Sequence, residues 1–525
     1  MQIFSFSPFG YEGALVSVEV DLRRGIPAID IVGLADGAVK ESRERMQAAI
    51  RNSGFDFPPE RVLISLSPAD LKKEGAGFDL PIALGVLVAN GTANGDKDFI
   101  SEPILIMGEL ELSGNIRPVK GVHAAVSTAV SCGIMQCIVP LQNADEAREV
   151  IGVKVFGADT LDNAYRALKD NSFFEAKSIA EDGKIDYLPP GSVEIDGVHF
   201  SEVFPEYEFA DVKGQEKLIR ALQICAAGGH NFLAVGSPGC GKTMAIQKFP
   251  ALNPFLTMEE SQSVTRIWSL AGLIKPSEPI IRVPPFRMPH QTATIEGLCG
   301  GGFNCRPGEI SLAHNGVLFL DEAAEFRTSV LQMLRVPLEN GEITLSRAGR
   351  ATKYPANFQL IMAVNPCPCG NYGSKTKICL CSAKSIEQYW KKFSAPLLDR
   401  IDLRLFVDNN SEENKTEREK FSTTAEIRKD IAKAVSIQRK RQGVKNAKLT
   451  PRDVLSFCGL DSECKKVLDK AILRYGFSSR AVSSCMKVAR TIADLEGSEN
   501  ISQKNIKEAI EFRKVCSNMI PENDG

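Results

Sequence analysis

The sequence lacks an excess of charge of either sign. Its 525 residues include 63 Lys and Arg against 65 Asp and Glu, which leaves a formal net charge of −2. No global field therefore draws the chain toward nucleic acid or anionic lipid. Any contact with DNA must come from local basic patches, or from patches that gather when subunits assemble.

The sequence also lacks targeting signals, internal repeats and low-complexity tracts. The stretch MQIFSFSPFGYEGALVSVEV has neither a basic region nor an uninterrupted apolar core, so we do not expect a secretory signal. The longest apolar run, around LPIALGVLVAN, is shorter than a bilayer span. We therefore expect a cytoplasmic protein without a membrane partner. Structural disulfides are rare in that compartment, where clustered cysteines more often bind metal or do redox work.

Periodicity divides the chain into four parts. Alternating strand and helix patterns predict an α/β domain over residues 1–168, and the stretch at 169–205 predicts a linker or a long loop of either neighbour. The strand–helix alternation resumes over 206–408, with glycine-rich turns. Repeated helical stripes without strand signals predict an all-α domain over 409–525. The expected fold class is α/β with a C-terminal helical domain.

One glycine-rich segment has the pattern of a phosphate-binding loop. The apolar strand Phe232 to Val235 leads into GSPGCGKT, and a helix-compatible stretch follows. Glycines let backbone N–H groups turn inward around phosphates, the lysine reaches the β- and γ-phosphates, and the hydroxyl ligates Mg²⁺. The residues predicted to bind ATP are Gly236, Ser237, Pro238, Gly239, Cys240, Gly241, Lys242 and Thr243.

Two further strands complete the pattern of a hydrolase site. The strand in NGVLFLDEAAEF ends in Asp321 and Glu322, which alone would be a buried strand with exposed acids at its end. Beside a phosphate-binding loop, Asp321 is expected to hold Mg²⁺ together with Thr243, and Glu322 to orient or deprotonate the attacking water. A later strand ends in Asn365, which could touch the γ-phosphate or that water. The sequence thus predicts Mg²⁺-dependent ATP hydrolysis.

These elements, in this order, resemble the AAA+ ATPases, and longer stretches resemble one bacterial family, the magnesium-chelatase-like ComM/YifB proteins. The resemblance covers nearly the whole chain. It is carried by VGLADGAVKESRERMQAAIRNSGFDFPPERVLISLSPADLKKEGAGFDLPIALGVL, GSPGCGKT, FRMPHQTATIEGLCGGG, RPGEISLAHNGVLFLDEAAEF, VNPCPCG, APLLDRIDL and SRAVSSCMKVARTIADLEG. Ala323 and Ala324 stand where the family more often has Leu-Pro, and Ala395 where Gly is usual, but no chemical group is lost.

The resemblance implies a ring-forming, hexameric ATPase with an AAA+ core and a C-terminal helical lid. Asn365 then takes the sensor-1 role. Arg400 resembles the arginine finger that reaches a neighbour's nucleotide, and Arg480 resembles the sensor-2 arginine, acting in cis or in trans. Taken alone, each arginine is more often a surface residue than a catalytic one.

The N-terminal domain resembles the Lon-protease-like, S5-like fold. Lon-type peptidases need a Ser–Lys dyad. Here the nucleophile position is taken by Gly77 or Phe78, and the position of the lysine is taken by His123. Without nucleophile and base we expect no proteolysis. The domain is interpreted as a binding or ring-organising module.

Four of the fourteen cysteines stand in the short stretch CPCGNYGSKTKICLC, an insertion at 367–381. They are Cys367, Cys369, Cys379 and Cys381. Two C-x-C pairs can place four sulfurs around one tetrahedral Zn²⁺, and a metal would hold a polar loop that has little core of its own. Free thiols and a redox pair are the alternatives.

The resemblance also implies a DNA substrate, with branch migration during recombination of incoming DNA in natural competence. A predicted β-hairpin carries Arg347, Arg350 and Lys353, and a glycine-rich segment carries Arg306. Copies of such cations around a ring could track phosphates without reading bases. Solvated loop charges are the alternative for each residue. A magnesium-chelatase-type remodeller of a partner protein, and a scaffold that uses ATP only to assemble, remain as other functions.

Overall fold

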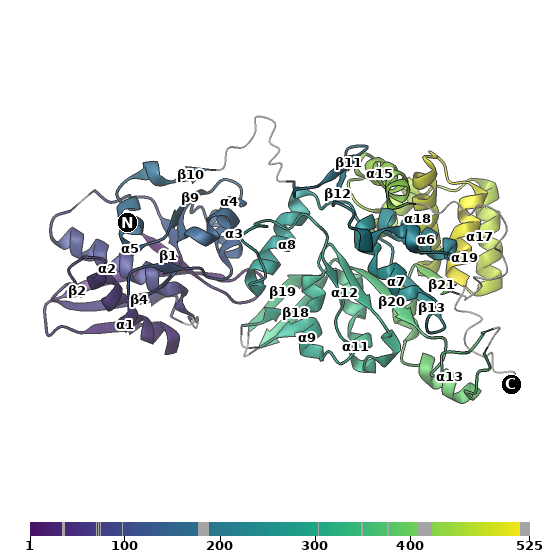
Figure 1. Cartoon of the computed structure of the whole chain (residues 1–525), viewed down its shortest axis with the longest axis horizontal. Coiled ribbons are helices and arrows are strands. Elements are labelled where there is room, and N and C mark those ends of the chain that lie inside the picture. Colours follow the sequence, from purple (N-terminus) through teal and green to yellow (C-terminus); the bar gives the residue numbers. More distant parts are fainter. Residues whose placement is uncertain are drawn as a thin grey trace.

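A computed structural model describes most of the chain. The described residues are 1–33, 37–69, 71, 73, 75–96, 98–176, 188–302, 304–347, 350–374, 377–407 and 423–514. An N-terminal α/β region lies at one end, a second α/β region lies in the middle, and the C-terminal helices lie at the other end (Figure 1).

The N-terminal region is built on a mixed eight-stranded sheet in the order β10-β9-β8-β5-β1-β2-β4-β3. The strands are β1 (Ile3–Ser7), β2 (Ala14–Arg23), β3 (Ile29–Val32), β4 (Arg61–Ser67), β5 (Ile104–Ile106), β8 (Gln136–Pro140), β9 (Lys154–Ala158) and β10 (Glu175–Ala176). One face is covered by α1 (Gly37–Asn52), α2 (Asp79–Ala93) and α5 (Leu161–Ala167), and the other by α3 (Val122–Ser131) and α4 (Ala144–Arg148). Alternate residues of each strand therefore enter two separate cores.

Helix α2 holds the apolar run noted in the sequence. With the turn before it, it forms an 18-residue stretch, Ala76–Ala93, whose length and composition alone would suit a membrane span. The sequence pattern therefore underestimated its length. Yet 56% of the stretch is buried, and α2 packs against β2, α1 and α5. A helix that is apolar on all sides is expected at the centre of a domain, and that is where α2 lies.

The central region contains a five-stranded parallel sheet in the order β14-β17-β20-β13-β21. Its strands are β14 (Phe286–Arg287), β17 (Val317–Leu320), β20 (Gln359–Val364), β13 (Phe232–Gly236) and β21 (Leu403–Val407). The accompanying helices are α6 (Glu216–Gly228), α7 (Lys242–Gln247), α8 (Met258–Ala271), α9 (Ile295–Cys299), α10 (Glu309–Leu312), α11 (Thr328–Met333), α12 (Arg335–Asn340), α13 (Ala383–Trp390) and α14 (Ala395–Asp399). The carboxyl ends of all five strands meet at one edge.

The C-terminal helices are α15 (Thr424–Arg441), α16 (Pro451–Phe457), α17 (Ser462–Tyr475), α18 (Ser479–Glu496) and α19 (Gln503–Lys514). The predicted all-α character is thus confirmed for residues 423–514. Helices α15 and α18 pack on α6, so one apolar core runs from a face of the central sheet through α6 into this domain.

The predicted linker at 169–205 has folded elements at both ends. Strand β10 pairs with β9 of the N-terminal sheet. Strands β11 (Val193–Ile195) and β12 (Val198–Phe200) form a hairpin whose Phe200 side chain is buried in the core of the central and helical domains. The guanidinium of Arg428 lies over the Phe200 ring at 5.1 Å. Only the middle of the segment lies outside the described residues.

Helix α8 joins the central region to the N-terminal region (Figure 1). The Nε2 atom of His123 lies 2.8 Å from Oε1 of Gln262 on α8, and Nε2 of Gln262 donates to the carbonyl of Glu149 at 2.7 Å. Ser269 of α8 donates to the carboxylate of Glu146. Burial lowers the pKa of His123 to about 4, so its imidazole is neutral at pH 7. The residue in the expected Lon lysine position thus serves as an interdomain contact.

Candidate active site

The phosphate-binding loop lies between β13 and α7, as the sequence predicts. Gly241 precedes the helix with φ = 85°, a left-handed conformation that favours glycine. Gly236 ends the strand so close to β21 that an added Cβ would lie 2.3 Å from the carbonyl oxygen of Val407. Both glycines are therefore required by the backbone path that forms the loop.

The Lys242 ammonium lies against the loop itself. Its Nζ donates to the carbonyl of Gly236 at 2.6 Å and to that of Ser237 at 3.0 Å, and its side chain is buried. Because both acceptors belong to the loop, the ammonium is held at the centre of the turn, where a triphosphate would meet it.

The acids that follow β17 lie beside this loop. Thr243 Oγ1 donates to Oδ1 of Asp321 at 3.1 Å, which brings together the two residues predicted to hold Mg²⁺. Glu322 has φ = 47° and ψ = 46°, a left-handed conformation that is uncommon for a residue with a side chain. Its N–H donates to the same Asp321 oxygen at 2.9 Å. Such strain often marks a functional site, and here it accompanies an exposed glutamate.

A cavity of about 370 Å³ unites most of the predicted residues. It is lined by Pro238, Gly239, Cys240, Gly241, Lys242, Thr243, Met244, Asp321, Glu322, Ala363, Val364 and Asn365. Asn365 thus lies across the cavity from the loop, at the end of the strand between β13 and β17. None of these lining residues is an arginine, so Arg400 and Arg480 do not line the nucleotide cavity of their own chain.

The two arginines instead share a carboxylate on α12. Arg400 pairs with Glu339, and Nη1 of Arg480 lies 3.8 Å from Oε1 of Glu339. No local pattern in the sequence marks Glu339, which precedes Arg400 by 61 residues. The two arginines, 80 positions apart in the numbering, therefore belong to one cluster around Glu339, in which the Arg400 side chain is only 9% exposed.

The four predicted cysteines converge. Their Sγ atoms all lie within 4.8 Å of one another, with Cys367–Cys379 at 3.7 Å and Cys369–Cys379 at 3.6 Å. A tetrahedron with Zn–S bonds of 2.3 Å has sulfur–sulfur edges of about 3.8 Å, so the four thiols fit a Zn²⁺ site. A hydrogen bond from the Asn371 backbone lowers the pKa of Cys369, whereas the pKa values of Cys379 and Cys381 are raised beside their neighbouring thiols, so Cys369 is the thiol that ionises first.

The cysteine loop also contacts the phosphate-binding loop. An added Cβ on Gly370 would lie 2.5 Å from Cδ of Pro238. On the other side of the cluster, Trp390 Nε1 donates to the carbonyl of Pro366 at 3.0 Å. The position of the cysteine loop is therefore tied to that of the phosphate-binding loop.

The predicted DNA contacts fall on two small hairpins. Strands β18 (Glu342–Arg347) and β19 (Arg350–Pro355) pair as predicted, and β15 (Gly300–Gly301) pairs with β16 (Arg306–Pro307). Arg306 is exposed, whereas Lys353 pairs with Glu342 at 2.6 Å. The side chains of Arg347 and Arg350 lie outside the described part of the structure. The larger hairpin also touches the N-terminal region, since the Tyr11 N–H donates to Thr352 at 3.2 Å.

The order of the strands defines the class of protein. The strand that ends in Asn365 lies between the loop strand and the acidic strand, and a helical domain follows the last strand of the sheet. This is the arrangement of the AAA+ ATPases, and the chain is one of them.

Comparisons with known proteins narrow this class. Family models described as "Magnesium chelatase, subunit ChlI", "Subunit ChlI of Mg-chelatase" and "Magnesium chelatase, subunit ChlI C-terminal" match residues 208–415, 18–143 and 422–513. Competence protein ComM of Haemophilus influenzae is 36% identical over 98% of this chain and 97% of its own length. The YifB protein of Escherichia coli K12 is 37% identical over 96% and 95%. The chain belongs to the ComM/YifB family of magnesium-chelatase-like AAA+ proteins.

Proposed function

We propose that this protein is a ring-forming ATPase that couples ATP hydrolysis to movement along DNA, and that branch migration during recombination in natural competence is its task. The position of the arginines is the observation that supports assembly into a ring. A AAA+ site needs a guanidinium at the γ-phosphate, and the cavity formed by one chain contains none among its lining residues. The guanidinium must then come from a neighbouring subunit.

The shared carboxylate extends this argument to Arg480. Because Arg400 and Arg480 both approach Glu339, an interface that delivers one to the neighbour's nucleotide brings the other with it. We therefore assign both arginines a role in trans, with Lys242, Thr243, Asp321, Glu322 and Asn365 acting within their own chain. A closed ring of six subunits is the proposed assembly, in the cytoplasm and without a membrane partner.

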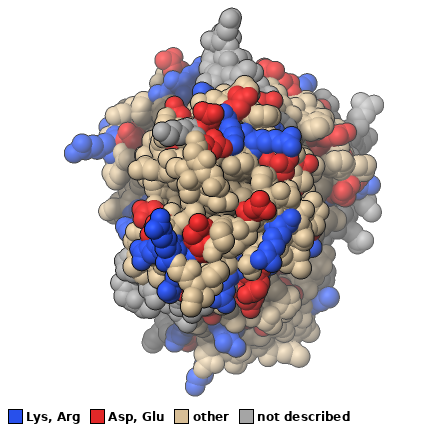
Figure 2. Space-filling model, turned by 90° about the vertical axis from the view of Figure 1, so that its left-hand side faces the viewer, with Lys and Arg blue, Asp and Glu red and all other residues tan. Residues whose placement is uncertain are grey.

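The proposed DNA contacts are the two hairpins and not the end of the molecule formed by the N-terminal region. Figure 2 shows the end of the molecule formed by the N-terminal region, where basic and acidic side chains are interspersed. That face offers no broad positive surface. The hairpins that carry Arg306, Arg347, Arg350 and Lys353 are the proposed contacts, since repeated copies would give a positive channel for the phosphate backbone.

The alternative, a chelatase-type remodeller, has weaker support. The 38 kDa magnesium-chelatase subunit of Cereibacter sphaeroides is 25% identical over only 30% of this chain and 53% of its own length. The competence protein matches nearly end to end. The deciding experiment is a branch-migration assay on a synthetic four-way junction, with wild type beside Glu322→Gln. Strand exchange that needs ATP and is lost in the variant supports the proposal, and intact junctions with active ATPase favour the remodeller.

DNA is expected to stimulate ATP hydrolysis in a salt-dependent way. Each phosphate contact released by salt contributes a slope of about −0.7 to −0.9 in a plot of log affinity against log salt. Combining Arg306→Gln with Lys353→Gln should make that slope shallower and raise the DNA concentration needed for half-stimulation. Lys391→Gln, at an exposed residue that directly follows α13, is the control. A rate that is indifferent to DNA and salt would exclude the DNA motor.

We also propose that the cysteine cluster holds a structural Zn²⁺. Protein purified without chelator should contain about one zinc per chain. Cys379→Ser should remove the metal, lower the melting temperature and reduce ATP hydrolysis, because the cysteine loop contacts the phosphate-binding loop at Pro238. Cys132→Ser, at an exposed cysteine of the N-terminal region, should change none of these. A zinc content far below one equivalent per chain in active protein would reject the zinc site and favour free thiols.

A further inference from the structure

A second pocket lies at the opposite edge of the central sheet from the nucleotide cavity. Gly316 precedes β17 and Gln359 begins β20, so the pocket borders the amino ends of the parallel strands, whereas the phosphate-binding loop lies at their carboxyl ends. Its volume is about 360 Å³, within the range of small-molecule sites. Neither the nucleotide chemistry nor the proposed DNA contacts use it.

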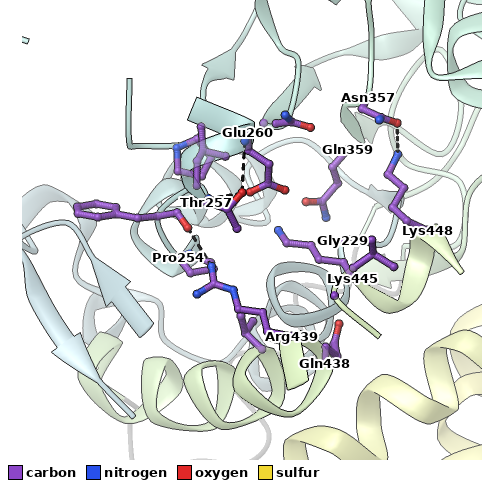
Figure 3. A pocket seen from close by; sticks show the side chains of 18 of the residues that line it. Gly229, Pro254, Thr257, Glu260, Asn357, Gln359, Gln438, Arg439, Lys445 and Lys448 are labelled. Carbon is purple, nitrogen blue, oxygen red and sulfur yellow. Dashed lines mark hydrogen bonds between the residues drawn. The ribbon is translucent and has the colours of Figure 1, made fainter. Parts of the chain in front are cut away.

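Segments from distant parts of the chain build this pocket. Thr257 and Glu260 come from the start of α8, Arg439 comes from the end of α15, and Lys445 and Lys448 come from the loop after α15 (Figure 3). Phe255, Leu256 and Val435 add apolar wall. The pocket therefore spans the junction between the central sheet and the helical domain.

The charge inside the pocket is unbalanced. Arg439, Lys445 and Lys448 face a single carboxylate, that of Glu260. None of the three cations has an ion-pair partner within 4.0 Å among the described residues. Glu260 accepts the Thr257 N–H at 2.9 Å as part of the capping box that starts α8, so its carboxylate serves the helix. The lining residues therefore carry a net charge of +2, and Asp402, which acts on Lys448, lies outside the lining.

Lys445 is the central group. Its stem packs on Gly229, where an added Cβ would lie 3.0 Å from Cδ of the lysine. Figure 3 shows its ammonium extending into the pocket between Glu260 and Arg439. No hydrogen bond to this ammonium occurs within the described ranges of the chain. Burial lowers the pKa of Lys445, and Arg439 lowers it further, although Glu260 opposes the change. An anion beside Lys445 would remove this penalty.

The remaining groups flank this centre. Arg439 donates to the carbonyl of Phe255 at 3.1 Å, and Lys448 donates to Oδ1 of Asn357 at 3.1 Å. Partial burial, Lys445 and Lys487 lower the pKa of Lys448 against the opposing effect of Asp402, although its side chain is exposed at the rim of the pocket. Both side chains keep further N–H donors that point to no described partner.

We propose that this pocket binds the phosphate group of a small phosphorylated molecule. A phosphate dianion matches the net charge of the lining, and a guanidinium with two ammonium groups supplies donors on several sides of it. A single carboxylate would balance only one of the charges. The organic part of the ligand, where there is one, packs against Phe255, Leu256 and Val435. The bound ligand bridges the helical domain to the start of α8, whose other face carries the N-terminal region.

Calorimetric titration of full-length Lys242→Ala protein tests this site, because that change weakens phosphate binding at the nucleotide loop. Pyrophosphate is expected to bind saturably, and adding Lys445→Gln should weaken the affinity at least tenfold. Lys448→Gln should weaken it less, since Lys448 lies at the edge beside Asn357. Lys440→Gln, at an exposed position of α15, is the matched control and should have no effect. Equal melting temperatures of these variants establish that each is folded.

Three probes separate the source of the phosphate. If inorganic phosphate binds as tightly as adenosine monophosphate, the pocket is a site for free phosphate. If the nucleotide binds more tightly, the organic part of the ligand contributes to binding through the apolar wall. Absence of saturable binding by all probes at about 10 mM, or an unchanged affinity in Lys445→Gln, overturns the proposal. Displacement of pyrophosphate by a short single-stranded oligonucleotide would also overturn it and make the pocket part of a DNA surface.

Discussion

Replacing Glu322 with glutamine is expected to slow ATP hydrolysis at least 100-fold while ATP still binds. Loss of a positioned general base typically costs 10² to 10⁴ in rate. The glutamine keeps the size of the side chain, so the left-handed backbone at Glu322 and the Asp321–Thr243 contact should survive. Steady-state phosphate release, measured beside the affinity for a fluorescent ATP analogue, separates the two effects.

Glu325→Gln provides the matched control for this change. It removes the same charge three residues later, from an exposed side chain that does not line the nucleotide cavity. Its hydrolysis rate should equal that of wild type. If Glu322→Gln hydrolysed ATP at more than a tenth of the normal rate, the water-activating group would have to be sought elsewhere in the cavity.

Arg400→Ala is expected to keep ATP binding and to lose roughly 10³ or more in hydrolysis rate, the usual worth of an arginine finger. The reason is structural: Arg400 is absent from the lining of its own nucleotide cavity and lies with Arg480 at Glu339 instead. Arg400→Lys keeps a cation and should recover only a small part of the rate, because an ammonium lacks the planar fork of donors.

Mixing two inactive variants gives the sharper test of the same idea. In a mixed ring, an Arg400→Ala subunit still offers an intact Glu322, and a Glu322→Gln subunit still offers an intact Arg400. Random assembly then makes about one quarter of the interfaces complete, and hydrolysis should return. Because no such complementation is possible when both groups act in one chain, a mixture as inactive as its parts would refute the trans assignment.

Glu339→Gln is a milder change with a predictable direction. It removes the carboxylate that Arg400 and Arg480 share in the single subunit. If that pairing competes with delivery of the arginines to a neighbour, the variant should hydrolyse ATP at a rate equal to or above that of wild type. A large loss of activity would instead show that Glu339 positions the arginines in the assembled site.

The sequence alone was enough to predict the residues of the nucleotide site. The phosphate-binding loop, the acids after β17 and Asn365 each follow an apolar strand, and parallel strands bring their carboxyl ends to one edge. The four cysteines were also found from local spacing. Such features are readable because the residues that act together are near one another in the chain, or end neighbouring strands of one sheet.

Only the tertiary structure decided how distant segments combine. It placed Arg400 and Arg480 on one carboxylate and set the cysteine loop against Pro238. It also turned His123 toward α8. The basic pocket takes its lining from α8, α15, the loop after α15 and the starts of two strands. No local sequence pattern predicts these contacts between distant segments. They depend on how helices pack on a sheet and on which charges that packing leaves unpaired.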